Sequence, residues 1–65
     1  MRLLYRCRGV ALADMGEGYA ILKQGQVYLD AIETPREAVI AFSEVLQTEM
    51  LRRVERYEQK KRAEP

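Results

Sequence analysis

The residues that most often carry catalysis are scarce in this sequence. It contains no histidine and one cysteine, Cys7, which lies between Arg6 and Arg8. Neighbouring positive charges favour a reactive thiolate, but no imidazole is present to act as its general base. A single cysteine also cannot form a zinc site of the usual kind. We therefore predict Cys7 to be a structural residue on the core side of a strand.

The carboxylates of the first half lie in or near predicted loops. Acid–base catalysis or binding of a hard cation would require several of them to converge in one pocket. The spacing of Asp14, Glu17 and Asp30 indicates no such cluster. The Gly16-Glu17-Gly18 segment lacks the lysine of a phosphate-binding loop. We predict a protein that is not an enzyme and that uses no metal and no cofactor.

Basic residues are concentrated towards the C-terminus, although the whole chain is nearly balanced, with 11 basic and 10 acidic residues. The run contains Arg52, Arg53, Arg56, Lys60, Lys61 and Arg62. Cations near the end of a helix interact favourably with its dipole, and this is the simpler interpretation. The alternative is a nucleic-acid contact, in which arginines bind phosphates beside base-stacking tyrosines. That contact would use Arg6, Arg8, Arg52, Arg53 and Arg56.

The clearest structural element is a long helix, predicted over 35–62. Thr34 supplies an N-cap, Pro35 occupies the first helical position, and Glu37 can close a capping box. Apolar residues then recur every three or four positions, which is typical of an amphipathic helix on a globular core. They are Val39, Phe42, Leu46, Met50, Val54 and Tyr57.

The first half of the chain predicts a three-stranded antiparallel sheet within 2–33. Residues 19–23 and 26–32 flank Gln24-Gly25, a two-residue turn of the type I′ kind. Upstream, the alternation of apolar residues changes phase after Gly9, which we interpret as a bulge within one strand. The order is β-β-β-α. We predict a single α+β domain over 1–65, a three-stranded β-meander with the helix packed on one face.

One helix covers only one face of a sheet, and the hairpin register predicts what lies on the other. It places Leu22 opposite Val27 on the side expected to carry the helix, and Ile21 opposite Tyr28 on the uncovered side. A cluster of large apolar side chains in water is unusual. We therefore predict a protein-binding surface at Tyr19, Ile21 and Tyr28. The competing interpretations are simple exposure of one or two of them, or a register shifted by one residue.

The predicted helix is also longer than the sheet. About 27 residues at 1.5 Å each span about 40 Å, whereas strands of six or seven residues span about 20–23 Å. The apolar stripe continues along the part that overhangs. We predict a dimer contact there, formed by Met50, Leu51, Val54 and Tyr57. Fraying of the helix after about Arg53 is the alternative.

A chain of 65 residues is only marginally stabilised by its own core. Because an intramolecular disulfide is impossible with one cysteine, a second copy is favoured as the source of additional buried surface. No apolar run is long enough to cross a membrane, no signal-peptide pattern opens the chain, and a lone thiol suits the cytoplasm. We predict a cytoplasmic homodimer.

One segment resembles the start of HicB-type antitoxin domains, in which a Gly-Tyr strand precedes a Thr-x-x-Glu-Ala helix. It consists of Gly18-Tyr19-Ala20-Ile21, a following strand and Thr34-Pro35-Arg36-Glu37-Ala38. The Pro-Gly-Cys type stretch and the DNA-binding tail of that family are missing. The resemblance implies a similar strand–helix architecture, and we take no functional residue from it.

Together these features predict a small non-catalytic binding protein that acts through protein–protein contacts. Inhibitors, adaptors and small regulators are proteins of this kind, and a phage or mobile-element origin would suit one. The alternative is a nucleic-acid-binding regulatory module that uses the basic C-terminal helix and the Arg/Tyr face of the sheet. The salt dependence of binding distinguishes these two functions, because binding to phosphates weakens steeply as the salt concentration rises.

Overall fold

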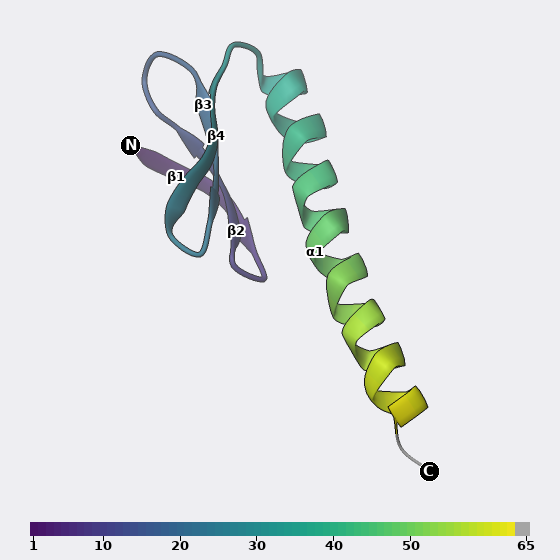
Figure 1. Ribbon diagram of the computed structural model, residues 1–65. Helices are drawn as coiled ribbons and strands as arrows, with labels where there is room; N and C mark the ends of the chain where they lie inside the picture. Colours follow the sequence, from purple (N-terminus) through teal and green to yellow (C-terminus); the bar gives the residue numbers. More distant parts are fainter. Residues whose placement is uncertain (64–65) are drawn as a thin grey trace.

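The computed structural model describes residues 1–63 and shows an antiparallel sheet beside one C-terminal helix, an α+β fold (Figure 1). The strands are β1 (Arg2–Cys7), β2 (Val10–Asp14), β3 (Tyr19–Lys23) and β4 (Gln26–Ile32). They lie side by side in chain order, and each pairs antiparallel with the next. A short link then leads into the helix α1 (Pro35–Ala63).

The prediction of three strands is wrong, because Gly9 lies in a turn and not in a bulge. Arg8 and Gly9 have φ angles of 52° and 84°, close to the 56° and 81° of Gln24 and Gly25. Positive φ at both central residues defines the type I′ turn, whose twist matches that of the strands it joins. The chain therefore reverses at Gly9 as it does at Gly25, and the predicted first strand is a hairpin of two.

Both edge strands contain a bulge that turns two adjacent side chains towards the helix. In β1 the register shifts between Leu3 and Tyr5, which leaves Leu4 as the extra residue. In β4 the register shifts twice: one shift leaves Tyr28 as the extra residue beside Leu29, and the other leaves an extra residue at Asp30 or Ala31. A bulge re-aims the side chains next to it. Leu4 and Tyr5 consequently line one hollow against α1, and Tyr28 and Leu29 line another.

The main core lies between α1 and one face of the sheet. Its buried residues are Val10, Leu12 and Ile21 from the sheet and Ala38, Phe42 and Val45 from the helix. The opposite face, here called the open face, has a smaller cluster made mostly of alanine. That cluster consists of Ala11, Ala13, Ala20 and Leu22.

The two faces of the sheet are the reverse of those predicted. Ile21 is fully buried beneath α1, although the prediction placed it on the uncovered side. Leu22 pairs with Val27 as predicted, but Leu22 belongs to the open face. Alternation along a strand determines which residues share a face, and says nothing about which face receives the helix. The helix covers the face on which the two central strands carry Val10, Leu12 and Ile21, the larger side chains.

Helix α1 starts at an N-cap and extends well beyond the sheet. Thr34 Oγ1 accepts a hydrogen bond from the backbone amide of Glu37 at 3.2 Å, which satisfies one of the free donors of the first turn. Every residue from Met50 to Arg62 is exposed. The molecule is consequently 53 Å long and only 19 by 15 Å across, and the green-to-yellow half of α1 extends past the sheet in Figure 1.

Candidate protein-binding surface

Two stripes of side chains run along α1, and only one of them faces the sheet. The sheet-facing residues are Ala38, Phe42, Val45 and Glu49. The second set, which we call the exposed stripe, consists of Val39, Leu46, Met50, Val54 and Tyr57, all exposed except Leu46, which is half-buried beside the main core. At 3.6 residues per turn the second stripe lies about 100° around the helix from the first. The single apolar stripe of the prediction is therefore divided between a buried side and an exposed one.

The exposed stripe begins as one wall of a groove between β1 and α1. This β1–α1 groove has a volume of about 440 Å³ and is lined by Leu4, Tyr5, Leu12, Val39, Phe42, Ser43 and Leu46. The rings of Tyr5 and Phe42 meet edge to face, with centroids 5.5 Å apart and an interplanar angle of 87°, an arrangement that aromatic pairs favour. Leu4 and Tyr5 are still 46% and 60% exposed, so the groove is an apolar surface open to solvent.

Beyond Glu49 the stripe continues where α1 has left the sheet, and we call this part of the helix, Met50–Arg62, the overhang. The predicted dimer residues Met50, Leu51, Val54 and Tyr57 are 47%, 58%, 55% and 64% exposed. They lie within one arc of about 120° around the helix. Scattered single apolar residues are normal on a protein surface, whereas a contiguous patch marks an interaction site. One side of the overhang is thus an apolar surface in continuity with the groove.

The three residues predicted to form a protein-binding face do not lie on the open face. Ile21 is buried in the main core, and Tyr19 packs partly against the same core. Tyr28 is 56% exposed and lies on the helix side, with Lys23 Nζ 5.1 Å from its ring centroid. Tyr19 and Ile21 differ from the prediction because the helix covers the other face of the sheet. Tyr28 differs because the bulge in β4 directs its side chain towards α1.

The five arginines considered for nucleic-acid binding lie in three different parts of the molecule. Arg6 pairs with Ala11 of the open face, and Arg8 lies in the turn before β2. The remaining three, Arg52, Arg53 and Arg56, are exposed on the overhang of α1. Arg52 and Arg56 continue the sheet-facing stripe at three- and four-residue spacing. A basic stripe and an apolar stripe therefore run side by side along the overhang.

An ion pair marks the place where α1 leaves the sheet. Lys23 Nζ lies 2.7 Å from Glu49 Oε1, and the two side chains are only 22% and 17% exposed. Arg52 Nη1 lies 3.8 Å from the same oxygen. The hydrogen bond from Lys23 is the main cause that lowers the pKa of Glu49 below its usual value of 4.5, against a smaller opposing effect of lost hydration. Sequence analysis missed this pair, because no local pattern connects β3 with the middle of the helix.

We expect Glu49→Gln to reduce the loss of unfolding free energy that occurs when the pH is lowered. Because the folded-state pKa of Glu49 is lowered, its ionised form stabilises the fold at pH above 4.5, and this stabilisation is lost as the pH falls through the lowered pKa. Urea unfolding from about pH 7 to about pH 3 should show a smaller fall for Glu49→Gln than for the wild type. Glu58→Gln, on the exposed overhang, should follow the wild type. Parallel curves for Glu49→Gln and the wild type would contradict a role for this pair.

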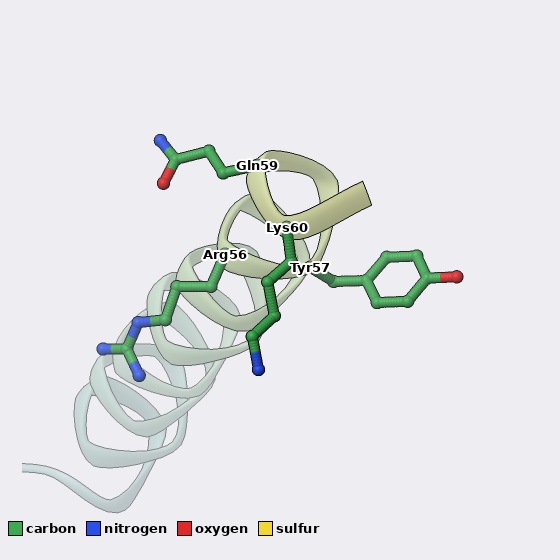
Figure 2. A pocket seen from close by; sticks show the side chains of 4 residues that line it. All are labelled: Arg56, Tyr57, Gln59 and Lys60. Atoms are coloured by element: carbon green, nitrogen blue, oxygen red, sulfur yellow. The ribbon is translucent and has the colours of Figure 1, made fainter. Parts of the chain in front are cut away.

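The hollow at the far end of α1 does not form a site. Its lining residues are Arg56, Tyr57, Gln59 and Lys60, all from one helix. Figure 2 shows these side chains spreading from the helix in different directions. Binding sites for small molecules are concave and enclose most of the ligand. A single convex helix end provides no such enclosure.

The remaining candidate residues have local structural roles. Asp14 accepts a hydrogen bond from the backbone amide of Gly16 at 2.9 Å within the β2–β3 turn, and Cys7 is half-buried against the main core. Among residues 1–63, no group of three or more His, Cys, Asp or Glu residues is placed to hold a metal ion. No helix in this described part is long and apolar enough to span a membrane. Compared with known proteins, the chain matches no family model, no curated protein and no solved structure.

Proposed function

We propose that this protein is a small non-catalytic binding protein that acts through protein–protein contacts and forms a homodimer through α1. The observation that carries this proposal is the amount of surface that a single chain leaves uncovered. The accessible surface is 5431 Å², whereas a compact monomer of 7.6 kDa exposes about 4,300 Å². The radius of gyration is 14.5 Å, against about 11 Å for a compact domain of this length.

Much of the uncovered apolar surface lies along α1. Met50, Leu51, Val54 and Tyr57 are each about half exposed or more on the overhang. A helical segment of about a dozen residues without tertiary contacts is marginal in water. A second copy supplies an identical apolar stripe in a symmetric arrangement. Burial of the two overhangs in one interface would stabilise both as helices.

A non-catalytic role is supported by the positions of two nucleophilic side chains and by the absence of a histidine from the sequence. Cys7 is packed against the core, and the hydroxyl of Thr34 caps α1. The chain contains no histidine to act as their base. The β1–α1 groove is lined almost entirely by apolar side chains, which suits a protein partner. These features are those of an inhibitor, an adaptor or a small regulator.

Light scattering tests the dimer directly. We expect a molar mass about twice 7.6 kDa, and a monomeric mass for Val54→Glu combined with Tyr57→Glu, because each new carboxylate would be buried without a partner. Gln59→Glu is the matched control, since it adds a charge on roughly the opposite side of the same helix, and it should keep the dimer. A wild-type mass that stays at 7.6 kDa up to the highest soluble concentration would contradict the proposal.

The basic stripe of the overhang supports a second candidate, a nucleic-acid-binding module. Arg52, Arg56 and Lys60 follow one another at four-residue spacing and are all exposed. Contacts of these side chains with phosphates would appear as co-purifying nucleic acid that is released as the salt concentration rises. A protein that is free of nucleic acid at low salt and keeps its dimer mass at high salt supports the apolar contact instead.

A further inference from the structure

We propose that the two copies associate antiparallel, so that the overhang of each α1 lies in the β1–α1 groove of the other. This inference rests on the proposed homodimer and specifies which surfaces meet. Val39 and Leu46 line the groove, and Met50, Val54 and Tyr57 continue the same stripe beyond the sheet. Because groove and overhang lie on the same side of one straight helix, a partner helix laid along the stripe enters the groove.

The large side chains of the groove and of the exposed stripe are placed symmetrically along α1 about the level of Thr48. The mirrored pairs are Leu46 with Met50, Phe42 with Val54 and Val39 with Tyr57, which lie two, six and nine residues on either side of Thr48. In a two-fold dimer, residue i of one copy contacts residue j of the other, and the reverse contact is also made. When the axis lies at the level of Thr48, the overhang residues Met50, Val54 and Tyr57 of one copy each meet a groove residue of the other copy.

The groove has the shape and composition to receive the end of the overhang. The ring of Tyr57, 64% exposed in the single chain, would lie opposite Val39, near the edge-to-face pair of Tyr5 and Phe42. An additional aromatic ring in such a cluster is favourable beyond its buried area. Leu4, which the bulge in β1 turns towards α1, would close the other side of the contact.

The excess accessible surface of the single chain is large enough for this antiparallel interface. The accessible surface of 5431 Å² exceeds the value of about 4,300 Å² for a compact monomer of 7.6 kDa by about 1,100 Å², and a standard interface buries about 800 Å² on each partner. A parallel pair through the two overhangs alone would leave both grooves open, with Leu4 and Tyr5 about half exposed. The antiparallel pair covers both overhangs and both grooves at once.

The charge along α1 also favours the antiparallel direction. Residues 35–49 contain one arginine and three glutamates, whereas residues 50–62 contain six basic and two acidic residues. A parallel pair would place the two basic halves side by side, within the Debye length of about 8 Å at physiological salt. The antiparallel pair places each basic half beside the acidic half of the other copy, which is the complementary arrangement.

Engineered cysteines test the direction of pairing. Ser43 lines the groove and Arg53 lies beside the exposed stripe. They are five residues on either side of Thr48, so the antiparallel pair brings Ser43 of one copy opposite Arg53 of the other. In a Cys7→Ala background, a mixture of Ser43→Cys and Arg53→Cys chains should form a disulfide-linked pair under mild oxidation. Each variant alone should not, because identical positions would be about 15 Å apart along the helices and a disulfide requires Cα atoms within about 7 Å.

The outcomes separate this inference from the dimer on which it rests. Mass spectrometry identifies the linked species, and light scattering gives the mass of the reduced variants. Efficient linkage of Arg53→Cys to itself shows a parallel pair, and unlinked variants that are still dimeric show a different interface. Either result overturns the antiparallel arrangement and leaves the dimer intact. A monomeric wild-type protein overturns both.

A second measurement examines the groove on the strand side, far from α1 in the sequence. Leu4→Glu should raise the dissociation constant of the dimer at least about tenfold, because a carboxylate in the apolar groove would be buried without a partner. Val27→Glu is the matched control: Val27 is 52% exposed and pairs with Leu22 of the open face. It should leave the dissociation constant unchanged. Equal effects of the two substitutions would show that the groove is not part of the contact.

Discussion

Replacing Phe42 with alanine should lower the free energy of unfolding by about 3–5 kcal/mol. Phe42 is only 6% exposed and is the largest side chain buried in the main core. Its removal would leave a cavity between α1 and the sheet that the hydrogen-bonded strands cannot close. At about 0.05–0.15 kcal/mol per residue, a chain of this length has about 3–10 kcal/mol of stability in total, so this loss removes a large part of it. Urea unfolding followed by circular dichroism should show a much lower midpoint for the variant than for the wild type.

The matched control lies two residues earlier on the same helix. Ile40 is 51% exposed, so Ile40→Ala should change the free energy of unfolding by about 0.5 kcal/mol or less. Phe42→Leu keeps most of the buried volume and should recover most of the lost stability. If Ile40→Ala and Phe42→Ala lose equal stability, the packing of α1 against the sheet does not hold this fold together.

Sequence reasoning succeeded where the cause of a feature lies within a few residues of it. The Gln24-Gly25 turn needs two residues with positive φ, and glycine at the second place is a local signal for it. The N-cap is equally local, since Thr34 bonds an amide three residues further on. The overhang could be predicted because the lengths of a helix and of a strand depend only on their number of residues and the rise per residue.

Prediction from the sequence failed where a feature depends on distant parts of the chain or on an unusual residue. Arg8 adopts positive φ in the first hairpin, and arginine is not the residue that signals a type I′ turn. Ala31 has a φ of 57° in the irregular part of β4, with no glycine or asparagine to indicate it. The choice of sheet face depended on which of two alternating sets packs better under α1. Both sets contain apolar residues, so the period of the strand could not decide.

The candidate surface also has one part that could be predicted from the sequence and one part that could not. The exposed residues Met50, Val54 and Tyr57 could be named in advance, because nothing in the chain is long enough to cover them. The β1–α1 groove could not, because it depends on the extra residue Leu4 in β1. Without that bulge, Leu4 and Tyr5 would point to opposite faces of the sheet, and α1 would have no apolar wall facing it there.

Gly18→Ala should lower the free energy of unfolding by more than about 2 kcal/mol. Gly18 has a φ of +153°, and a Cβ at this position would lie 2.9 Å from the carbonyl oxygen of Ile32. A non-glycine residue held in an unfavourable backbone region costs about 1–3 kcal/mol, and a backbone oxygen cannot rotate away as a flexible side chain can. A shift of Ile32 would also disturb the main core, against which its side chain packs. Urea unfolding of the variant measures the combined loss.

Gly16→Ala separates the two causes, because Gly16 lies in the same turn with a φ of +94° and no described atom within 4 Å of its would-be Cβ. Its free energy of unfolding should fall only by the cost of placing alanine at positive φ, which is about 1 kcal/mol. A larger loss at Gly18 shows that the β2–β3 turn packs directly against the end of β4, immediately before the N-cap of α1. The turn would then help to fix the direction in which α1 leaves the sheet, and with it the position of the overhang. Equal losses would mean that the contact with Ile32 yields easily and that the direction of α1 is set by the main core alone.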